Sequence, residues 1–122
     1  MPRIKPPSEH EVQKQLIRVF RFKYPKLADC LIAIPNGGLR HVRVAAKLKA
    51  EGVRAGVSDL FLTVPRGDKH GLWLEMKTKG GRLTDHQKDW FEIQERQGYA
   101  TAVAFTADEG IEKIERYLSQ AD

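Results

Sequence analysis

Two short apolar segments that each carry an acidic residue constrain the fold of this chain most strongly. Val57–Val64 and Leu72–Lys77 have the composition of β-strands, and the turn-forming sequence Pro-Arg-Gly-Asp at 65–68 follows the first of them. A link this short favours an antiparallel hairpin. Because Asp59 and Glu75 stand inside these segments, the pattern predicts two carboxylates on neighbouring strands.

The rest of the chain alternates helical and extended patterns around this hairpin. Apolar residues recur at helical spacing after Ser8, and the pairs Thr84 with Gln87 and Thr106 with Glu109 have the spacing of capping boxes. A hairpin combined with crossover helices predicts an α/β fold, a central mixed β-sheet flanked by helices in the order αβαββαβα. The predicted elements are a helix over 8–23, a strand over 31–34, a helix over 39–51, strands over 57–64 and 72–77, a helix over 85–97, a strand over 100–105 and a helix after 106.

Length and composition indicate a single domain over residues 1–122. Hydrophobic residues make up 41% and charged residues 30% of the chain, which is the balance of a globular protein. Cys30 is the single cysteine, so an internal disulfide is excluded, and residues 1–7 lack the apolar core of a signal peptide. No apolar run approaches the length of about 18 residues that spans a bilayer. We therefore expect a protein of the reducing cytoplasm.

The net charge of +5 and the pI near 9.5 favour a polyanionic partner without requiring one, since a modest excess also keeps proteins soluble. Basic residues form one stripe on the second predicted helix, and two more flank the glycines after the hairpin. An Asn-Gly-Gly turn before that helix either makes a tight turn or lets nucleic acid approach closely. The candidate nucleic-acid contacts are Arg40, Arg43, Lys47, Lys79, Arg82 and Asn36.

The hairpin carries the residues with the clearest chemistry. Side chains alternate along a strand, so Glu75 and Lys77 share one face, and a register that aligns Asp59 with Glu75 brings both carboxylates within reach of one cation. Paired carboxylates repel each other unless a proton or metal neutralises them, and such oxygen ligands suit Mg²⁺ or Mn²⁺. The alternative is an Asp59 that belongs to a turn and an exposed ion pair of Glu75 with Lys77. The apolar surroundings favour the metal site.

These residues resemble a known nuclease motif. The segment 56–60 (Gly-Val-Ser-Asp-Leu), followed by 75–77 (Glu-Met-Lys), resembles the motif of the PD-(D/E)xK nuclease superfamily. With 34–38 (Ile-Pro-Asn-Gly-Gly) and Gln87, the order resembles the virus-type replication-repair nuclease family, VRR-NUC, over about residues 8–118. Ser58 stands where the superfamily often has proline. The resemblance implies a restriction-endonuclease-like fold and Mg²⁺-dependent hydrolysis of DNA phosphodiester bonds, with Mn²⁺ as a substitute.

The same resemblance implies roles for individual residues. Asp59 and Glu75 would bind the metal through their side chains, and Met76 through its backbone carbonyl. Lys77 would orient or activate the attacking water. Gln87 matches the motif glutamine of the family, although a capping box explains a glutamine at this position equally well.

The family pattern also implies a supporting glutamate in the first helix, and two residues compete for this role. At 100° per residue Glu9 falls on the arc of the apolar face and Glu11 on the far side. We therefore favour Glu9, as a ligand acting directly or through water; the alternative is a favourable interaction with the helix dipole. The histidines lack the paired spacing of a zinc site and Cys30 lacks a partner histidine, so none is assigned a metal or nucleophile role.

Freestanding members of the family resemble phage or bacterial replication and repair proteins. The resemblance implies a structure-specific endonuclease that acts as a homodimer on branched DNA such as four-way (Holliday) junctions, without an organic cofactor, in a bacterial or phage-infected cytoplasm. The alternatives are a non-catalytic DNA-binding module on the same fold, and a nuclease acting on flaps, ends or RNA. The intact set of Asp59, Glu75 and Lys77 favours a catalytic protein.

Overall fold

The computed structural model describes residues 5–35 and 42–121, and its elements follow the predicted order αβαββαβα. A 3₁₀ helix, η1, precedes the first strand and was not predicted. The elements are α1 (Glu9–Lys23), η1 (Pro25–Cys30), β1 (Leu31–Ala33), α2 (Val42–Ala50), β2 (Leu60–Leu62), β3 (Leu72–Met76), α3 (Asp85–Arg96), β4 (Ala100–Ala104) and α4 (Ala107–Leu118).

The four strands form one mixed sheet in the order β1-β2-β3-β4. β1 and β2 pair antiparallel, as do β2 and β3, whereas β3 and β4 pair parallel. The parallel pair is the one joined through a helix, α3, because a tight turn cannot connect parallel strands. The expected hairpin and the expected mixed sheet are therefore both confirmed.

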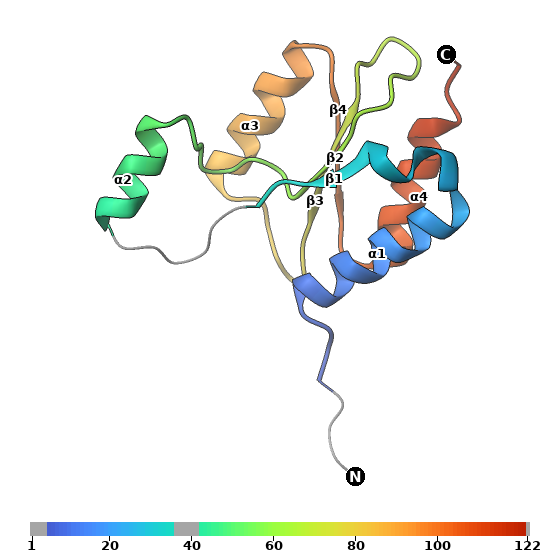
Figure 1. Ribbon diagram of the computed structural model, residues 1–122, viewed down its shortest axis with the longest axis horizontal. Coiled ribbons are helices and arrows are strands. Elements are labelled where there is room, and N and C mark those ends of the chain that lie inside the picture. The colour runs from blue at the N-terminus through green and yellow to red at the C-terminus, as the bar shows by residue number, and fades with distance from the viewer. Residues whose placement is uncertain (1–4, 36–41, 122) are drawn as a thin grey trace.

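Helices cover both faces of this sheet (Figure 1). α1 and α4 pack against each other on one face, where their apolar residues meet the core side chains of β2 and β3. Leu16 and Phe20 of α1 and Ile114 of α4 are fully buried there. α3 lies on the opposite face, next to β4. Leu72, Leu74 and Met76 point into the α1–α4 core, so the alternate residues of β3 point toward α3.

Side-chain caps fix where three of the helices begin. Ser8, Thr84 and Thr106 each accept a hydrogen bond from the backbone N–H three residues further on. Each cap satisfies one of the N–H groups that a helix start leaves without an intrahelical partner. Thr84 and Gln87 form the full reciprocal capping box that their spacing predicts.

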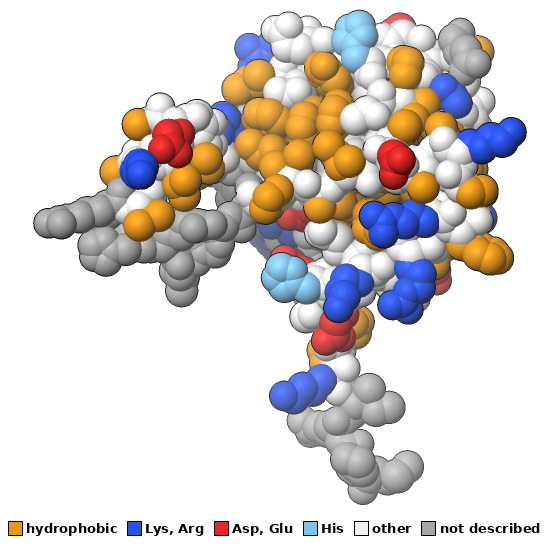
Figure 2. All heavy atoms as spheres, viewed as in Figure 1, with side chains coloured by type: hydrophobic (Ala, Val, Ile, Leu, Met, Phe, Trp, Pro, Cys, Tyr) orange, Lys and Arg blue, Asp and Glu red, His pale blue; other side chains and the backbone are white. Residues whose placement is uncertain are grey.

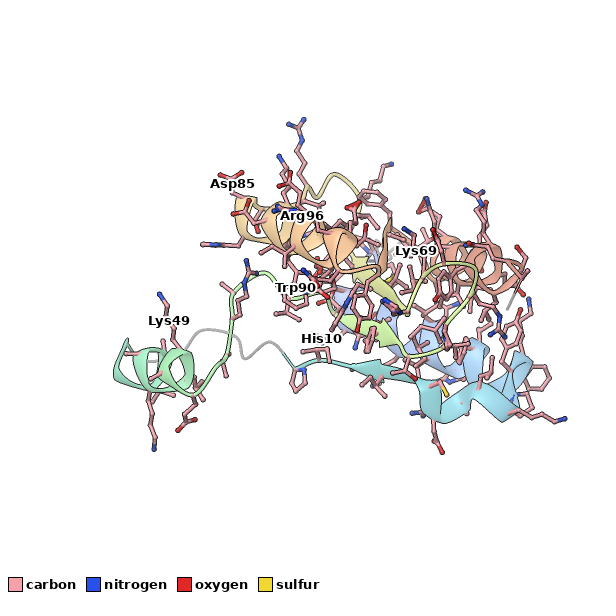
Figure 3. All side chains as sticks on the ribbon, turned by 90° about the horizontal axis from the view of Figure 1, so that it is seen from above. His10, Lys49, Lys69, Asp85, Trp90 and Arg96 are labelled. Atoms are coloured by element: carbon pink, nitrogen blue, oxygen red, sulfur yellow. The ribbon has the colours of Figure 1, made fainter. Side chains whose placement is uncertain are left out.

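The structure departs most from the predicted bounds at β2. β2 spans Leu60–Leu62, shorter than the expected 57–64, and the predicted start of the second helix at Leu39 lies outside the described residues. α2 stands away from the sheet and from α3 (Figures 1 and 3), and its Val44 side chain is exposed. None of the helices in residues 5–35 and 42–121 combines the length and apolarity needed to cross a bilayer.

Candidate active site

The register of the β2–β3 hairpin places Asp59 opposite Glu75. Leu60 pairs with Leu74 and Phe61 with Trp73, and the same register continued by one residue joins Asp59 to Glu75. Partners of this kind, flanked by the hydrogen-bonded pair of Leu60 with Leu74, have side chains that lie close together. The two carboxylates therefore meet at the end of β3, on the face that looks toward α3.

Asp59 also explains why β2 ends where it does. Its Oδ2 accepts a hydrogen bond of 2.9 Å from the backbone N–H of Met76. In a continued ladder, a backbone carbonyl of the neighbouring strand would accept from this N–H. The side chain of Asp59 takes that place, so regular pairing stops at Leu60 and the carboxylate is held at a fixed point beside Glu75.

Glu75 is a buried acid, with 3% of its surface exposed. Burial raises its pKa to about 8, repulsion from Asp59 adds to the increase, and the Lys77 ammonium opposes it. The Glu75 Oε1 atom finds no hydrogen-bond donor among the described residues. A buried acceptor without a partner is costly. Glu75 is therefore poised to gain from a proton or from a positive ion.

Gln87 joins α3 to this carboxylate. Its Nε2 donates a hydrogen bond of 3.1 Å to Glu75 Oε2, while its Oε1 accepts one of 2.9 Å from the backbone N–H of Thr84. The capping contact fixes the amide orientation, so the NH₂ group is the end that faces Glu75. Both interpretations of Gln87 are thus compatible, because one side chain makes both contacts.

Lys77 follows β3 on the same face as Glu75. Its Nζ lies 3.9 Å from Glu75 Oε2, and only 13% of its side chain is exposed. At this distance the pair attracts without a tight hydrogen bond. The structure therefore brings Asp59, Glu75, Lys77 and Gln87 together at one point between the hairpin and the start of α3.

The donor set at this point fits a hard divalent cation. It offers two carboxylates, and one oxygen of the buried Glu75 carboxylate has no partner within residues 5–35 and 42–121; carboxylate oxygens are the ligands that Mg²⁺ prefers. The N–H of Lys77 bonds to Ala104 of β4, whereas the N–H of Met76 points to Asp59. Because the N–H and C=O of one residue in a strand point to the same edge, the Met76 carbonyl also lies on the Asp59 side.

The first helix does not complete this group. Glu9 and Glu11 are both exposed, although Val12 and Leu16, which share the predicted arc of Glu9, are buried as expected. Within residues 5–35 and 42–121, no three His, Cys, Asp or Glu side chains are close enough to hold one metal ion. The role of Glu9 therefore stays a prediction.

The proposed nucleic-acid contacts lie outside this group of four. Lys47, Lys79 and Arg82 are exposed, on α2 and on the segment between β3 and α3. Asn36 and Arg40 fall outside the described residues. Arg43 lies within α2, but its side chain is not among those described.

Sequence reasoning missed the contact that attaches the Asp59 segment to α3. Gly56 has φ +85°, and a Cβ at this position would lie 2.5 Å from the backbone carbonyl of His86. Only glycine allows this approach. Nearby, the Arg54 guanidinium lies 5.3 Å from the centre of the Trp90 ring, and Trp90 points from α3 toward the sheet (Figure 3). Glycine next to the motif was the available signal, but a turn explained it as well.

Aromatic rings fill the space between β2, β3 and α3. Phe61 stacks on Trp73 with 4.2 Å between ring centres, and Trp90 meets Trp73 edge-on at 5.1 Å. Trp73 also donates a 3.0 Å hydrogen bond to Gln94 of α3. Trp73 lies on the face of β3 that carries Glu75, so this layer supplies the apolar surroundings that keep water from the carboxylate.

Comparison with known proteins agrees with this geometry. The family profile described as VRR-NUC domain matches residues 8–108. A solved structure named VRR_NUC domain protein is 32% identical in sequence and superimposes with a TM-score of 0.86, covering 98% of this chain and 94% of that one. No curated protein matches the chain. The chain belongs to the VRR-NUC domain family and has its nuclease-type fold.

Proposed function

We propose that this protein is a Mg²⁺-dependent endonuclease that hydrolyses DNA phosphodiester bonds, with branched DNA such as four-way junctions as its substrate. The observation that carries the proposal is the buried Glu75 carboxylate, which faces Asp59 and has one oxygen that no donor in the described part of the chain reaches. Membership of the VRR-NUC family supports the reaction class. The basic net charge of +5 supports a polyanionic substrate.

Each residue of the group has a distinct task in this hydrolysis. A water oxygen forms a bond to phosphorus, the bond from phosphorus to one sugar oxygen breaks, and that oxygen leaves with a proton. Asp59, Glu75 and the Met76 carbonyl would hold the Mg²⁺ ion, which neutralises phosphate charge and lowers the pKa of water. Lys77 orients the attacking water by donating hydrogen bonds to it. Gln87 keeps the Glu75 carboxylate in one orientation, since its own amide is fixed by the capping box.

The experiment is a cleavage assay on labelled four-way junction, flap, single-stranded and duplex DNA with Mg²⁺, Mn²⁺ or EDTA. We expect cleavage of the junction with either metal and none with EDTA. Asp59→Ala should abolish cleavage and leave binding of the junction largely intact. Asp68→Ala, which removes an acid from the exposed turn at the far end of the hairpin, should cleave like the unaltered protein.

Three outcomes would replace the proposal with one of its rivals. Junction binding without cleavage under any metal would indicate a non-catalytic DNA-binding module on the same fold. Preference for flaps, ends or RNA would keep the chemistry and change the substrate. Full activity of Asp59→Ala would remove the two-carboxylate mechanism.

Symmetric cleavage of a junction also needs two active sites. A homodimer supplies them through its two-fold axis, and we propose this state for the protein acting in the cytoplasm. The molar mass of the free protein from light scattering should then be twice the 13.9 kDa of one chain; a monomer at all concentrations tested would count against paired cuts by one particle.

A further inference from the structure

The outer face of α1 carries three cations that have no acidic partner in the described structure. Lys14, Arg18 and Arg21 are all exposed and follow one another at spacings of four and three residues, so they form one stripe. Val12, Leu16 and Phe20 occupy the opposite, buried side. None of the three cations takes part in an ion pair within residues 5–35 and 42–121.

Two arginines on other helices have an acidic partner one turn away. Arg96 pairs with Glu92 on α3, and Arg116 pairs with Glu112 on α4, both at i,i+4 spacing. α1 shows the reverse pattern, because Lys14 and Arg18 are like charges at i,i+4. Such a pair destabilises an isolated helix. Glu11 in the first turn lies three residues before Lys14, at the start of the stripe, but no ion pair joins the two in the described residues. From Lys14 onward the stripe carries cations alone.

The shape of this face suits a chain of phosphates. Lys14, Arg18 and Arg21, together with Gln13 and Ile17, line a shallow hollow of about 390 Å³ that opens to solvent. Figure 2 shows Lys and Arg side chains gathered over α1 on the face turned to the viewer. From Lys14 to Arg21 the helix rises about 10 Å, a length that spans about three phosphates of one DNA strand.

α1 covers the face of the sheet opposite to Asp59 and Glu75, and it shares with them one end of β3. α1 contacts β3, and in Figure 1 it begins beside the lower end of that strand, where the chain leaves β3. Glu75 and Lys77 lie at this same end. DNA with its scissile phosphate at the carboxylates would have to pass around this end of the sheet for one of its arms to lie along the outer face of α1.

We propose that Lys14, Arg18 and Arg21 bind the phosphate backbone of a duplex arm of the DNA substrate, on the side of the sheet opposite to the carboxylates. The inference rests on the proposed function, and the surface that it names does not include Asp59 or Glu75. Contacts of this type fix where the duplex lies and carry no sequence information. The apolar face of α1 is buried in the core, which makes it unable to insert into a lipid surface and favours nucleic acid as the partner.

The test compares two triple variants that lose the same charge. The stripe variant is Lys14→Ala with Arg18→Ala and Arg21→Ala. The control is Lys69→Ala with Arg96→Ala and Arg116→Ala, whose cations are paired with acids in the structure. Binding of a fluorescent four-way junction is measured by anisotropy in EDTA at several salt concentrations from about 50 to 200 mM, a range over which phosphate contacts strongly change the affinity.

We expect the stripe variant to bind the junction roughly 10–100-fold more weakly, with a log–log salt slope shallower by about 2–3, since each phosphate contact contributes about 0.9 to the slope. The control should change the slope by less than about 1. With Mg²⁺, the stripe variant should show a raised KM and an unaltered kcat, because the stripe touches no reacting atom. Its thermal midpoint should not fall, since repelling charges are removed.

Equal loss of affinity in both triple variants would overturn the inference, because net charge alone would then explain binding. An unaltered slope in the stripe variant would overturn it too, and so would unaltered junction binding combined with lost binding to phosphatidylserine vesicles. These outcomes leave the proposed function standing if the unaltered protein cleaves the junction. Failure of the unaltered protein to bind or cleave DNA would instead remove the proposed function.

Discussion

Replacing Glu75 by glutamine should remove a pH dependence from the stability of the metal-free protein. The side chain keeps its size, and glutamine can still accept the hydrogen bond from Gln87. In the folded protein, burial and Asp59 raise the pKa of Glu75 from its ordinary value of 4.5 to about 8. In the unfolded chain the carboxyl ionises near the ordinary value.

The sign follows from proton counting. Between these two pKa values the folded protein holds a proton that the unfolded chain has released, so raising the pH favours unfolding. Glu75 therefore contributes stability that is complete below about pH 4.5 and lost as the pH rises toward about 8. A pKa difference of one corresponds to about 1.4 kcal/mol. Over the interval of two pH values from about 5.5 to 7.5, the free energy of unfolding can therefore fall by at most about 2.7 kcal/mol. Water entry and relaxation reduce such effects, so we expect about 1–2 kcal/mol.

The assay is urea unfolding in EDTA, followed by tryptophan fluorescence. It is repeated at several values of pH from about 5.5 to 7.5, which lie between the pKa of Glu75 in the unfolded chain and its pKa in the folded protein. Trp73 and Trp90 lie beside the site and report its unfolding. The two proteins differ at this side chain alone, so the difference between their profiles isolates the contribution of Glu75. Mg²⁺ should restore stability to the unaltered protein more at pH 7.5 than at 5.5, since it binds the ionised carboxylates. Parallel stability profiles for the two proteins would refute the reasoning.

Two further substitutions test the packing that supports the site. Gly56→Ala should destabilise the protein by about 2–4 kcal/mol and lower cleavage, because its Cβ would meet the His86 backbone at 2.5 Å. The matched control is Gly52→Ala, where φ is +102° and the space around the residue is open; this change should cost only about 1 kcal/mol. Equal urea midpoints for the two variants would contradict the proposed contact. Leu16→Ala should cost about 2–5 kcal/mol in urea unfolding, because Leu16 is fully buried between α1 and α4; a cost below about 1 kcal/mol would mean that this core collapses around the cavity.

Local patterns were sufficient to predict most of the fold. Ser8, Thr84 and Thr106 each act within three residues of their own position, so the helix starts they specify could be predicted without tertiary information. The hairpin followed from a short link and from the alternation of apolar residues, whereas the register that aligns Asp59 with Glu75 was a condition that the structure met. The predicted strand over 57–64 was too long because β-propensity says nothing of Asp59, whose side chain takes a backbone position in the ladder.

The parts that were not predicted depend on contacts between distant elements. Glu9 was assigned to the apolar arc of α1 correctly by angle, but it lies one turn before the first buried residue, Val12, where the helix has left the core. A helical wheel shows toward which side of the helix a residue points, but it does not show whether the core extends as far along the helix as that residue. Gly56 could not be recognised as a packing contact because its partner is the backbone of His86, thirty positions later. Neither position carries a local signal that distinguishes these outcomes.

Two contacts with the first turn of α3 hold the site in place. Gly56 presses the segment before Asp59 against the start of α3, and Gln87, in that first turn, holds the Glu75 carboxylate. A shift of α3 would move Gln87 away from Glu75 and would open the contact between Gly56 and His86 at the same time. Because the two carboxylates are coupled in this way, loss of the Gly56 contact should weaken metal binding as well as stability. α1 takes part in neither contact, so its cations can be removed without disturbing the carboxylates. Experiments can therefore test the stripe and the site separately.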